Sequence, residues 1–136
     1  MNYLVDTNVC IAVVNGTPRS VVEHFDSEVR AGAGIFVSSI STFELWYGVA
    51  KSQQREFNRI RLEIFLAGAA QLLQFSEEDS VRAGELRALL EKQGTPVGSF
   101  DTLIAGQALA RGLVMVTHNV REFAQVPGLK VEDWQG

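Results

Sequence analysis

Four acidic residues stand at places in the sequence where a carboxylate could do chemistry. Asp6 directly follows the short apolar run Tyr3–Val5, and Glu44, Asp101 and Glu122 each fall in the first turn of a predicted helix. In open α/β sheets, ligand and metal sites lie in the crevice beyond the carboxyl ends of the strands. If these acids meet at one such edge, they form a cluster of hard oxygen donors.

A cluster of this kind predicts a particular reaction. Carboxylates within a few ångströms of one another repel, so the cluster must take up protons or bind a cation. The chain has one cysteine and two histidines, and oxygen ligands suit Mg²⁺ or Mn²⁺ better than zinc. Such ions polarise phosphate groups and lower the pKa of a bound water. The acids therefore predict metal-assisted hydrolysis of a phosphodiester.

Each acid also has a purely structural interpretation, and spacing alone leaves both open. Asp6 could cap the helix that follows it, because Asp is a preferred N-cap. Glu44 closes the sequence S-T-F-E, which fits a capping box in which the glutamate bonds back to its own helix terminus. The macrodipole of its helix would favour a negative charge such as Asp101 in the first turn. Glu122 could be a solvated acid beside Arg121.

The elements that must position these acids alternate between short apolar strands and helices. We predict strands at 2–5, 35–37, 71–75, 113–116 and 129–131, and helices from residue 7, at 18–31, 41–51, 53–68, 77–93 and 99–111, with a helical turn through 123. Ser76 and Ser99 are the expected N-caps of the last two long helices, and Gly94 and Gly112 the glycines that end them. This order predicts an α/β fold, a three-layer α/β/α domain with a central, mainly parallel sheet.

Parallel strands place their carboxyl ends on one rim, which would bring Asp6, Glu44 and Glu122 to the same edge. Asp101 follows the loop at 94–98 instead of a strand. Only tertiary packing could bring it into the cluster.

Length and composition predict a single domain over residues 1–136. No apolar run approaches the roughly 20 residues of a membrane span, and we expect a cytoplasmic protein without a membrane segment. The lone Cys10 is expected to be a buried apolar residue. A net charge of −4 argues against a protein that coats nucleic acid. Residues 51–61 carry four basic side chains and one acid, which fits either a solvated helix face or a contact for phosphate or an acidic partner.

Four stretches of the chain carry the acids in a specific order. They are Leu4–Asn8 with Asp6, Ser38–Gly48 with Glu44, Gly94–Gly106 with Asp101, and Val116–Phe123 with Asn119 and Glu122. Together they resemble the motifs of PIN-domain endoribonucleases, and specifically the VapC-type toxins of bacterial toxin–antitoxin pairs. The resemblance runs essentially from end to end, and the ending Pro127–Trp134 also fits.

This resemblance implies a PIN-like fold and Mg²⁺- or Mn²⁺-dependent cleavage of RNA by in-line attack of a metal-activated water, which leaves a 5′-phosphate and a 3′-hydroxyl. The residues that it implies are the metal ligands Asp6, Glu44 and Asp101, the further catalytic acid Glu122, and Thr117 and Asn119, which would orient water or the phosphate. It further implies an RNA substrate, with a tRNA anticodon loop as the best candidate, a cognate VapB-type antitoxin and a homodimer.

Several positions depart from the commoner pattern of the family or have an open role. Ser99, Gln107 and His118 differ from the usual residues, and none is an expected metal ligand, so they bear on substrate preference. His118 fits either an RNA contact or a local hydrogen bond. We expect Trp46 and Tyr47 in the core or at a dimer interface, in preference to a base-stacking platform.

Two other functions remain as alternatives. A phosphotransfer or phosphatase-type α/β domain would want a second carboxylate beside Asp6, but Thr7 and Asn8 follow instead. A non-catalytic, partner-binding PIN-like module would not need all four acids. The sequence therefore favours the nuclease.

Overall fold

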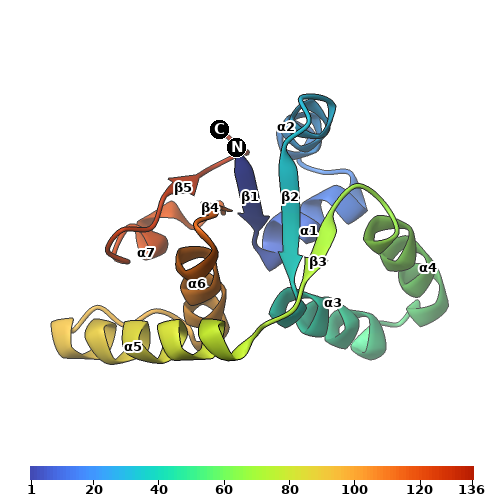
Figure 1. The fold of residues 1–136 in the computed structure, drawn as a ribbon. Coiled ribbons are helices and arrows are strands. Elements are labelled where there is room, and N and C mark those ends of the chain that lie inside the picture. The colour runs from blue at the N-terminus through green and yellow to red at the C-terminus, as the bar shows by residue number, and fades with distance from the viewer.

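The centre of the molecule is a parallel sheet of five strands, in a computed structural model that describes all 136 residues. The strands are β1 (Asn2–Val5), β2 (Gly34–Ser38), β3 (Gln71–Leu73), β4 (Val114–Val116) and β5 (Val131–Glu132). Their order is β3-β2-β1-β4-β5, and every neighbouring pair is parallel (Figure 1). The carboxyl end of β1 therefore lies between those of β2 and β4.

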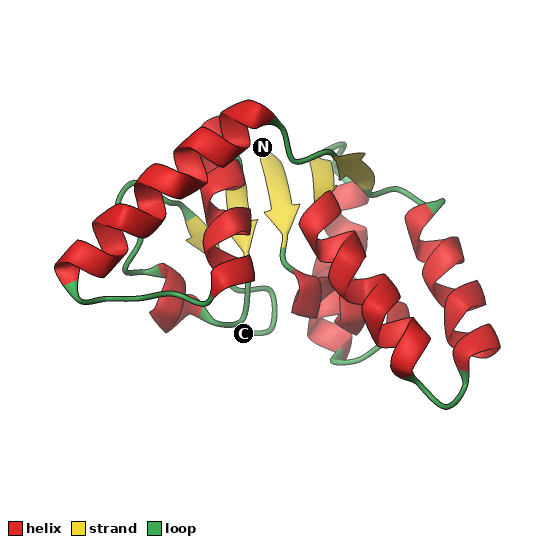
Figure 2. Ribbon diagram, turned by 90° about the horizontal axis from the view of Figure 1, so that it is seen from below, coloured by secondary structure: helices red, strands yellow, loops and turns green.

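Seven helices surround the sheet. They are α1 (Thr7–Asn15), α2 (Arg19–Arg30), α3 (Ser39–Lys51), α4 (Arg55–Leu66), α5 (Glu77–Gln93), α6 (Ser99–Arg111) and α7 (Val120–Phe123). Seen toward the carboxyl ends of the strands, α5 and α6 lie on one side and α3 and α4 on the other (Figure 2). The predicted three-layer α/β/α fold is confirmed. None of the helices combines the length and apolar character that crossing a membrane requires.

Alternation along β1 divides the core in two. Tyr3 and Val5 point to one face of the sheet and belong to a cluster with residues of α1 to α4, including the buried Cys10. Leu4 points to the other face, in a cluster with residues of α5, α6 and α7. Because both faces of β1 are covered, its apolar run is continuous, as in other buried parallel strands.

The close packing of α5 against α6 fixes the direction of α6. Gly106 in α6 makes this possible, because a Cβ at that position would lie 2.7 Å from the Cβ of Ala83 in α5. Farther along, the buried Asp79 carboxylate accepts hydrogen bonds from Gln107 Nε2 at 3.0 Å and from Arg111 Nε at 3.1 Å. These contacts position α6, which carries Asp101 in its first turn. They also explain Gln107 as a structural residue.

The start of α3 differs from the prediction. The helix begins at Ser39, directly after β2, and its N-cap is Ser38, whose Oγ accepts a hydrogen bond from Ile40 N at 3.1 Å. The predicted start at residue 41 was therefore wrong, and Glu44 lies in the second turn, not the first. Ser38 caps the helix because it ends the strand in an extended conformation.

Other boundaries also differ from the prediction. Gly98, not Ser99, is the N-cap of α6, and the Gly98 carbonyl accepts Thr102 N at 2.8 Å. The third strand ends at Leu73 instead of residue 75, and the last strand lies at 131–132 instead of 129–131. The predicted Ser76 cap is confirmed, with a capping box that Asp79 completes.

Candidate active site

The carboxyl ends of β1, β2 and β4 form one edge of the sheet, and polar side chains follow each of these strands. Asp6 comes directly after β1, and its N–H donates to Val116 O of β4 at 3.0 Å. Glu44 lies on α3, which leaves β2, while Asp101 arrives on α6 through the packing described above. All three acids line a single cleft of about 660 Å³.

Asp6 is both a helix cap and a member of this cleft. Its Oδ1 accepts a hydrogen bond from Val9 N at 2.9 Å, so the structural interpretation as an N-cap is correct. The side chain is only 5% exposed. Burial raises the pKa of Asp6, hydrogen bonds from Thr117 and Val9 N lower it, and the charge of Glu44 raises it again, with a net increase. Capping therefore leaves the carboxylate within the electrostatic reach of another acid.

Glu44 is fixed by α1 and not by its own helix. Thr7 Oγ1 donates to Glu44 Oε1 at 2.6 Å and lies 3.0 Å from Ser41 Oγ. The alternative interpretation of Ser41 and Glu44 as a capping box is wrong, because the chain enters α3 earlier and Ser41 is a buried residue within the helix. Glu44 is therefore half-buried and held at the cleft by Thr7, whose Oγ1 also contacts Ser41.

Asp101 lines the cleft, and Glu122 interacts with it from just outside the lining. Glu122 Oε1 accepts Gly98 N at 3.3 Å, and its Oε2 accepts Asn119 Nδ2 at 2.7 Å. Burial raises the pKa of Asp101 to about 7, together with the charge and hydrogen bond of Glu122 and the charges of Asp6 and Glu44. The fold thus brings the four predicted acids into one interacting group, with Asn119 beside it.

Comparison with known proteins agrees with this arrangement. The family model for the PIN domain matches residues 3–129 of this sequence. The tRNA(fMet)-specific endonuclease VapC of Shigella flexneri is 41% identical over 98% of each chain, and the protein of the same name from Salmonella typhimurium is 38% identical over the same shares. This chain belongs to the PIN-domain family, among its VapC proteins.

Solved structures show the same PIN fold. VapBC2 from Rickettsia felis, bound to a DNA fragment from its promoter, superposes with a TM-score of 0.91 at 36% identity, over 98% of this chain and 99% of the other. DNA-bound VapBC from Salmonella typhimurium gives a TM-score of 0.90 at 38% identity, over 98% of each chain. In each comparison, the match covers nearly the whole length of both superposed chains.

The donor set of this PIN domain consists of hard oxygen ligands. As the side chains lie, no three of its His, Cys, Asp and Glu residues converge closely enough to hold one metal ion. Burial raises the pKa of both Asp6 and Asp101, and neighbouring carboxylates raise it further: Glu44 for Asp6, and Glu122, Asp6 and Glu44 for Asp101. Such a set fits a divalent cation such as Mg²⁺ or Mn²⁺, which would relieve the repulsion.

Thr117 lies below the surface of the site, in contact with Asn119. It is fully buried, its hydroxyl bonds to Asp6, and its Oγ1 accepts Asn119 N at 3.0 Å. Thr117 does not line the cleft, and it is connected to the site through Asp6 and Asn119. Asn119 itself is exposed beside Glu122.

Several residues outside the predicted set also build the site. Thr7 holds Glu44 and is itself in contact with Ser41, and the N–H of Gly98 donates to Glu122. A sequence signal existed for Ser41, because it precedes Glu44 by three residues and shares its helix face. No local pattern indicated the roles of Thr7 and Gly98, which depend on contacts between elements.

Three further sequence-based interpretations can be compared with the structure. His118 Nδ1 lies 3.1 Å from Asp133 Oδ2, which is the local hydrogen bond. Trp46 and Tyr47 are exposed, so the core part of their prediction was wrong. In the basic segment 51–61, Arg59 pairs with acids of its own helix, as a solvated helix face would.

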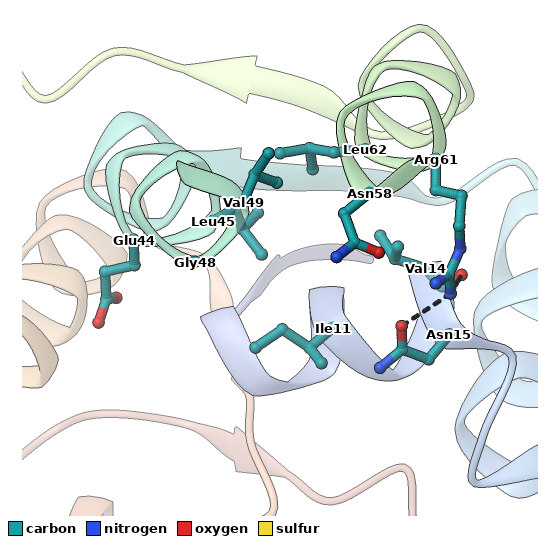
Figure 3. A pocket seen from close by; sticks show the side chains of 10 residues that line it. All are labelled: Ile11, Val14, Asn15, Glu44, Leu45, Gly48, Val49, Asn58, Arg61 and Leu62. Atoms are coloured by element: carbon teal, nitrogen blue, oxygen red, sulfur yellow. Dashed lines mark hydrogen bonds between the residues drawn. The ribbon is translucent and has the colours of Figure 1, made fainter. Parts of the chain in front are cut away.

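A second, apolar cavity of about 240 Å³ adjoins the cleft between α1, α3 and α4. Figure 3 shows Glu44 at one end of it and Arg61 at the other, with apolar side chains such as Leu45 and Leu62 between them. Arg61 Nη2 donates to Asn15 Oδ1 and to Val14 O, each at 2.7 Å. Glu44 therefore belongs to both cavities.

Proposed function

We propose that this PIN domain is a VapC-type endoribonuclease toxin that depends on Mg²⁺ or Mn²⁺. The observation that carries the proposal is the cleft itself, where Asp6, Glu44 and Asp101 meet beyond the strand ends and Glu122 lies beside them. Relatives that match over 98% of this chain are named ribonuclease or endonuclease VapC. We propose that residues 1–136 act as one PIN-like domain.

The metal would be held by Asp6, Glu44 and Asp101, and it would polarise the scissile phosphate and activate a water. Asp6 is fixed for this task by Val9 N, and Glu44 by Thr7. We assign to Glu122 the proton released by the attacking water, because Asn119 and Gly98 hold its carboxylate beside Asp101. In-line attack at phosphorus would leave a 5′-phosphate and a 3′-hydroxyl.

The proposed substrate is a single-stranded segment of a structured RNA, with a tRNA anticodon loop as the first candidate. Unpaired loops expose their backbone and bases, whereas an A-form duplex keeps both stacked. The relatives from Salmonella typhimurium and Shigella flexneri are named tRNA(fMet)-specific. This supports tRNA as the substrate class to test first.

We propose a cognate VapB-type antitoxin as the protein partner and a homodimer as the state of the free toxin. The similar structures from Rickettsia felis and Salmonella typhimurium are VapBC complexes. Co-purification with the product of a neighbouring reading frame, and loss of RNA cleavage in that complex, would test the antitoxin. Sedimentation of the free chain would test the dimer.

The deciding experiment is tRNA cleavage by the purified chain, with Mg²⁺ and with chelator, beside Asp6→Asn and Asp101→Asn. We expect cleavage only with metal and a loss of more than about 100-fold in both variants, because each removes a carboxylate that would bind the metal. Asp26→Asn, an exposed acid on α2 outside the cleft, is the matched control. Cleavage in chelator, or full activity in both cleft variants, would contradict the proposal.

The two alternative functions find less support. A phosphatase-type site would need a second acid next to Asp6, and Thr7 at that position bonds to Glu44 instead. A non-catalytic module gives no reason to bury Asp6 and Asp101 beside two further acids, at the cost of a raised pKa for both.

A further inference from the structure

We propose that Phe43 and Phe100 form a stacking platform for an unpaired base of the substrate RNA, at the mouth of the carboxylate cleft. This inference rests on the proposed function and deepens it, because it assigns the residues that hold the nucleotide beside the scissile phosphate.

The two rings come from different helices and meet over the cleft. Phe43 lies on α3 directly before Glu44, and Phe100 lies on α6 directly before Asp101. Their centroids are 5.7 Å apart with an interplanar angle of 63°, an edge-to-face pair. Both line the same cleft as Asp6. The aromatic pair is therefore built into the site by the same two helices that deliver two of its acids.

Both rings are largely exposed to solvent. Phe43 is 56% exposed and Phe100 is 43% exposed. Neither belongs to the core clusters on the two faces of the sheet. Exposed aromatic area beside a polar cleft is typical of a binding surface, and every nucleobase offers a flat apolar face that stacks on such rings.

One basic residue completes this side of the cleft. Lys51 is the only cationic residue among those that line it, and its Nζ lies 4.8 Å from the centroid of the Tyr47 ring. The other charged residues there are Asp6, Glu44 and Asp101. A chain with a net charge of −4 and an acidic cleft cannot hold RNA by phosphate neutralisation alone. Stacking supplies affinity that does not depend on charge, and Lys51 can meet one flanking phosphate.

The position of the platform favours a base over a second copy of this chain. The rings belong to the wall of the cleft that the substrate must enter, so a protein surface seated on them would cover the carboxylates. A stacked base instead leaves its own phosphate next to Glu44 and Asp101. Single-stranded RNA is recognised by splayed bases on aromatic side chains, which agrees with a loop substrate.

The test uses Phe43→Leu and Phe100→Leu, which keep apolar bulk and remove the ring. Two readouts are needed: the KM and kcat of loop cleavage in Mg²⁺, and fluorescence quenching of a loop oligonucleotide that carries 2-aminopurine, measured in Ca²⁺. We expect KM to rise about tenfold or more, the loss of one base stack, with kcat changed less than about twofold. Quenching should disappear in both variants and return in Phe43→Trp.

Phe57→Leu is the matched control, because Phe57 is 57% exposed on α4 and does not line the cleft. Its KM and quenching should equal those of the wild type. Wild-type KM and quenching in both cleft variants would overturn the platform. A second outcome would also overturn it. If the variants sediment as monomers where the wild type is a dimer, and RNA binding returns at high protein concentration, the rings join two copies instead of holding a base.

Failure of the proposed function gives a different result. If the wild type quenches the 2-aminopurine oligonucleotide through Phe43 but cuts no RNA with Mg²⁺ or Mn²⁺, the nuclease assignment fails and the platform stands. Thermal melting of each variant checks its fold, and wild-type melting is expected because both rings lie outside the core.

Discussion

Thr7 Oγ1 lies 2.6 Å from Glu44 Oε1, and this hydrogen bond joins the first turn of α1 to the second turn of α3. Thr7 is also the residue directly after Asp6. The same short segment of chain therefore supplies one carboxylate and orients another. Groups of this kind, which hold a metal-binding side chain without touching the metal, set the affinity of many metal sites.

Removing this hydroxyl should weaken metal binding. Thr7→Val keeps the shape of the side chain but leaves Glu44 free to turn toward solvent. We expect the apparent Mn²⁺ affinity to fall about tenfold, the lower end of the range for such supporting residues. Isothermal titration at pH 8 measures it.

Two variants serve as controls for Thr7→Val. Thr7→Ser retains the donor and should bind Mn²⁺ within about twofold of the wild type. Thr42→Val removes a hydroxyl from α3, the helix that carries Glu44. This hydroxyl donates to Ser39 O and not to a carboxylate. Equal losses in Thr7→Val and Thr42→Val would show that the effect is a general one on α3.

The raised pKa of Asp101 predicts how the metal-free protein responds to pH. Its folded value of about 7 lies above the ordinary value of 3.8, so the folded state binds this proton more tightly than the unfolded state. The contribution of the Asp101 carboxyl to the free energy of unfolding is therefore fully present below about pH 4, and it is lost as the pH rises through 7. Burial and the neighbouring acids are the cause.

Asp101→Asn should consequently stabilise the protein in chelator at pH 8, by about 1–2 kcal/mol after allowance for the partial exposure of the group. The gain should shrink toward pH 5, where the wild-type carboxyl keeps its proton. Urea denaturation at both pH values measures it. A gain that is the same at pH 5 and pH 8 would contradict the assigned pKa.

Asn119 should matter for turnover through its contact with Glu122. Asn119→Ala removes the 2.7 Å hydrogen bond that holds Glu122 Oε2, and we expect kcat to fall about tenfold, as for loss of an oriented general base. Gln125→Ala is the control, because Gln125 Nε2 donates to the main-chain O of the same Glu122 at 3.3 Å. Single-turnover cleavage should separate the two variants; similar rates would argue against a role for the Glu122 side chain.

The contact between α5 and α6 predicts opposite effects for two glycines. Gly106→Ala would place a methyl group 2.7 Å from Ala83 Cβ, and we expect a loss of about 1–3 kcal/mol in the free energy of unfolding despite the better helix propensity. Gly84→Ala, in α5 with no atom within 4 Å of a Cβ, should gain about 0.5–1 kcal/mol. Urea denaturation compares them, and a gain in both would mean that the helices separate at little cost.

Much of the fold followed from local pattern. The apolar runs at β1 and β4, the Ser76 cap and the glycines at 94 and 112 mark elements whose ends depend on nearby residues. The start of α3 did not follow, because Ser38, Ser39 and Ser41 are all acceptable caps and the end of β2 decides between them.

The site was predictable to a smaller extent. Asp6 and Glu122 follow strands of a parallel sheet, so their edge was foreseeable. The approach of Asp101 depends on the bare backbone of Gly106 against Ala83, and that of Glu44 on a threonine of another helix. Contacts between distant segments leave no periodic signal in the sequence.

The order in which the chain supplies its acids has a consequence for synthesis. The acidic group at the cleft comes from residues 6, 44, 101 and 122 of 136, and Glu122 lies on the helix that follows the fourth strand. A ribosome releases the first two acids long before the last two. A nascent chain therefore cannot gather all four carboxylates until most of it has emerged, and a product that terminates before Glu122 never acquires the complete acidic group.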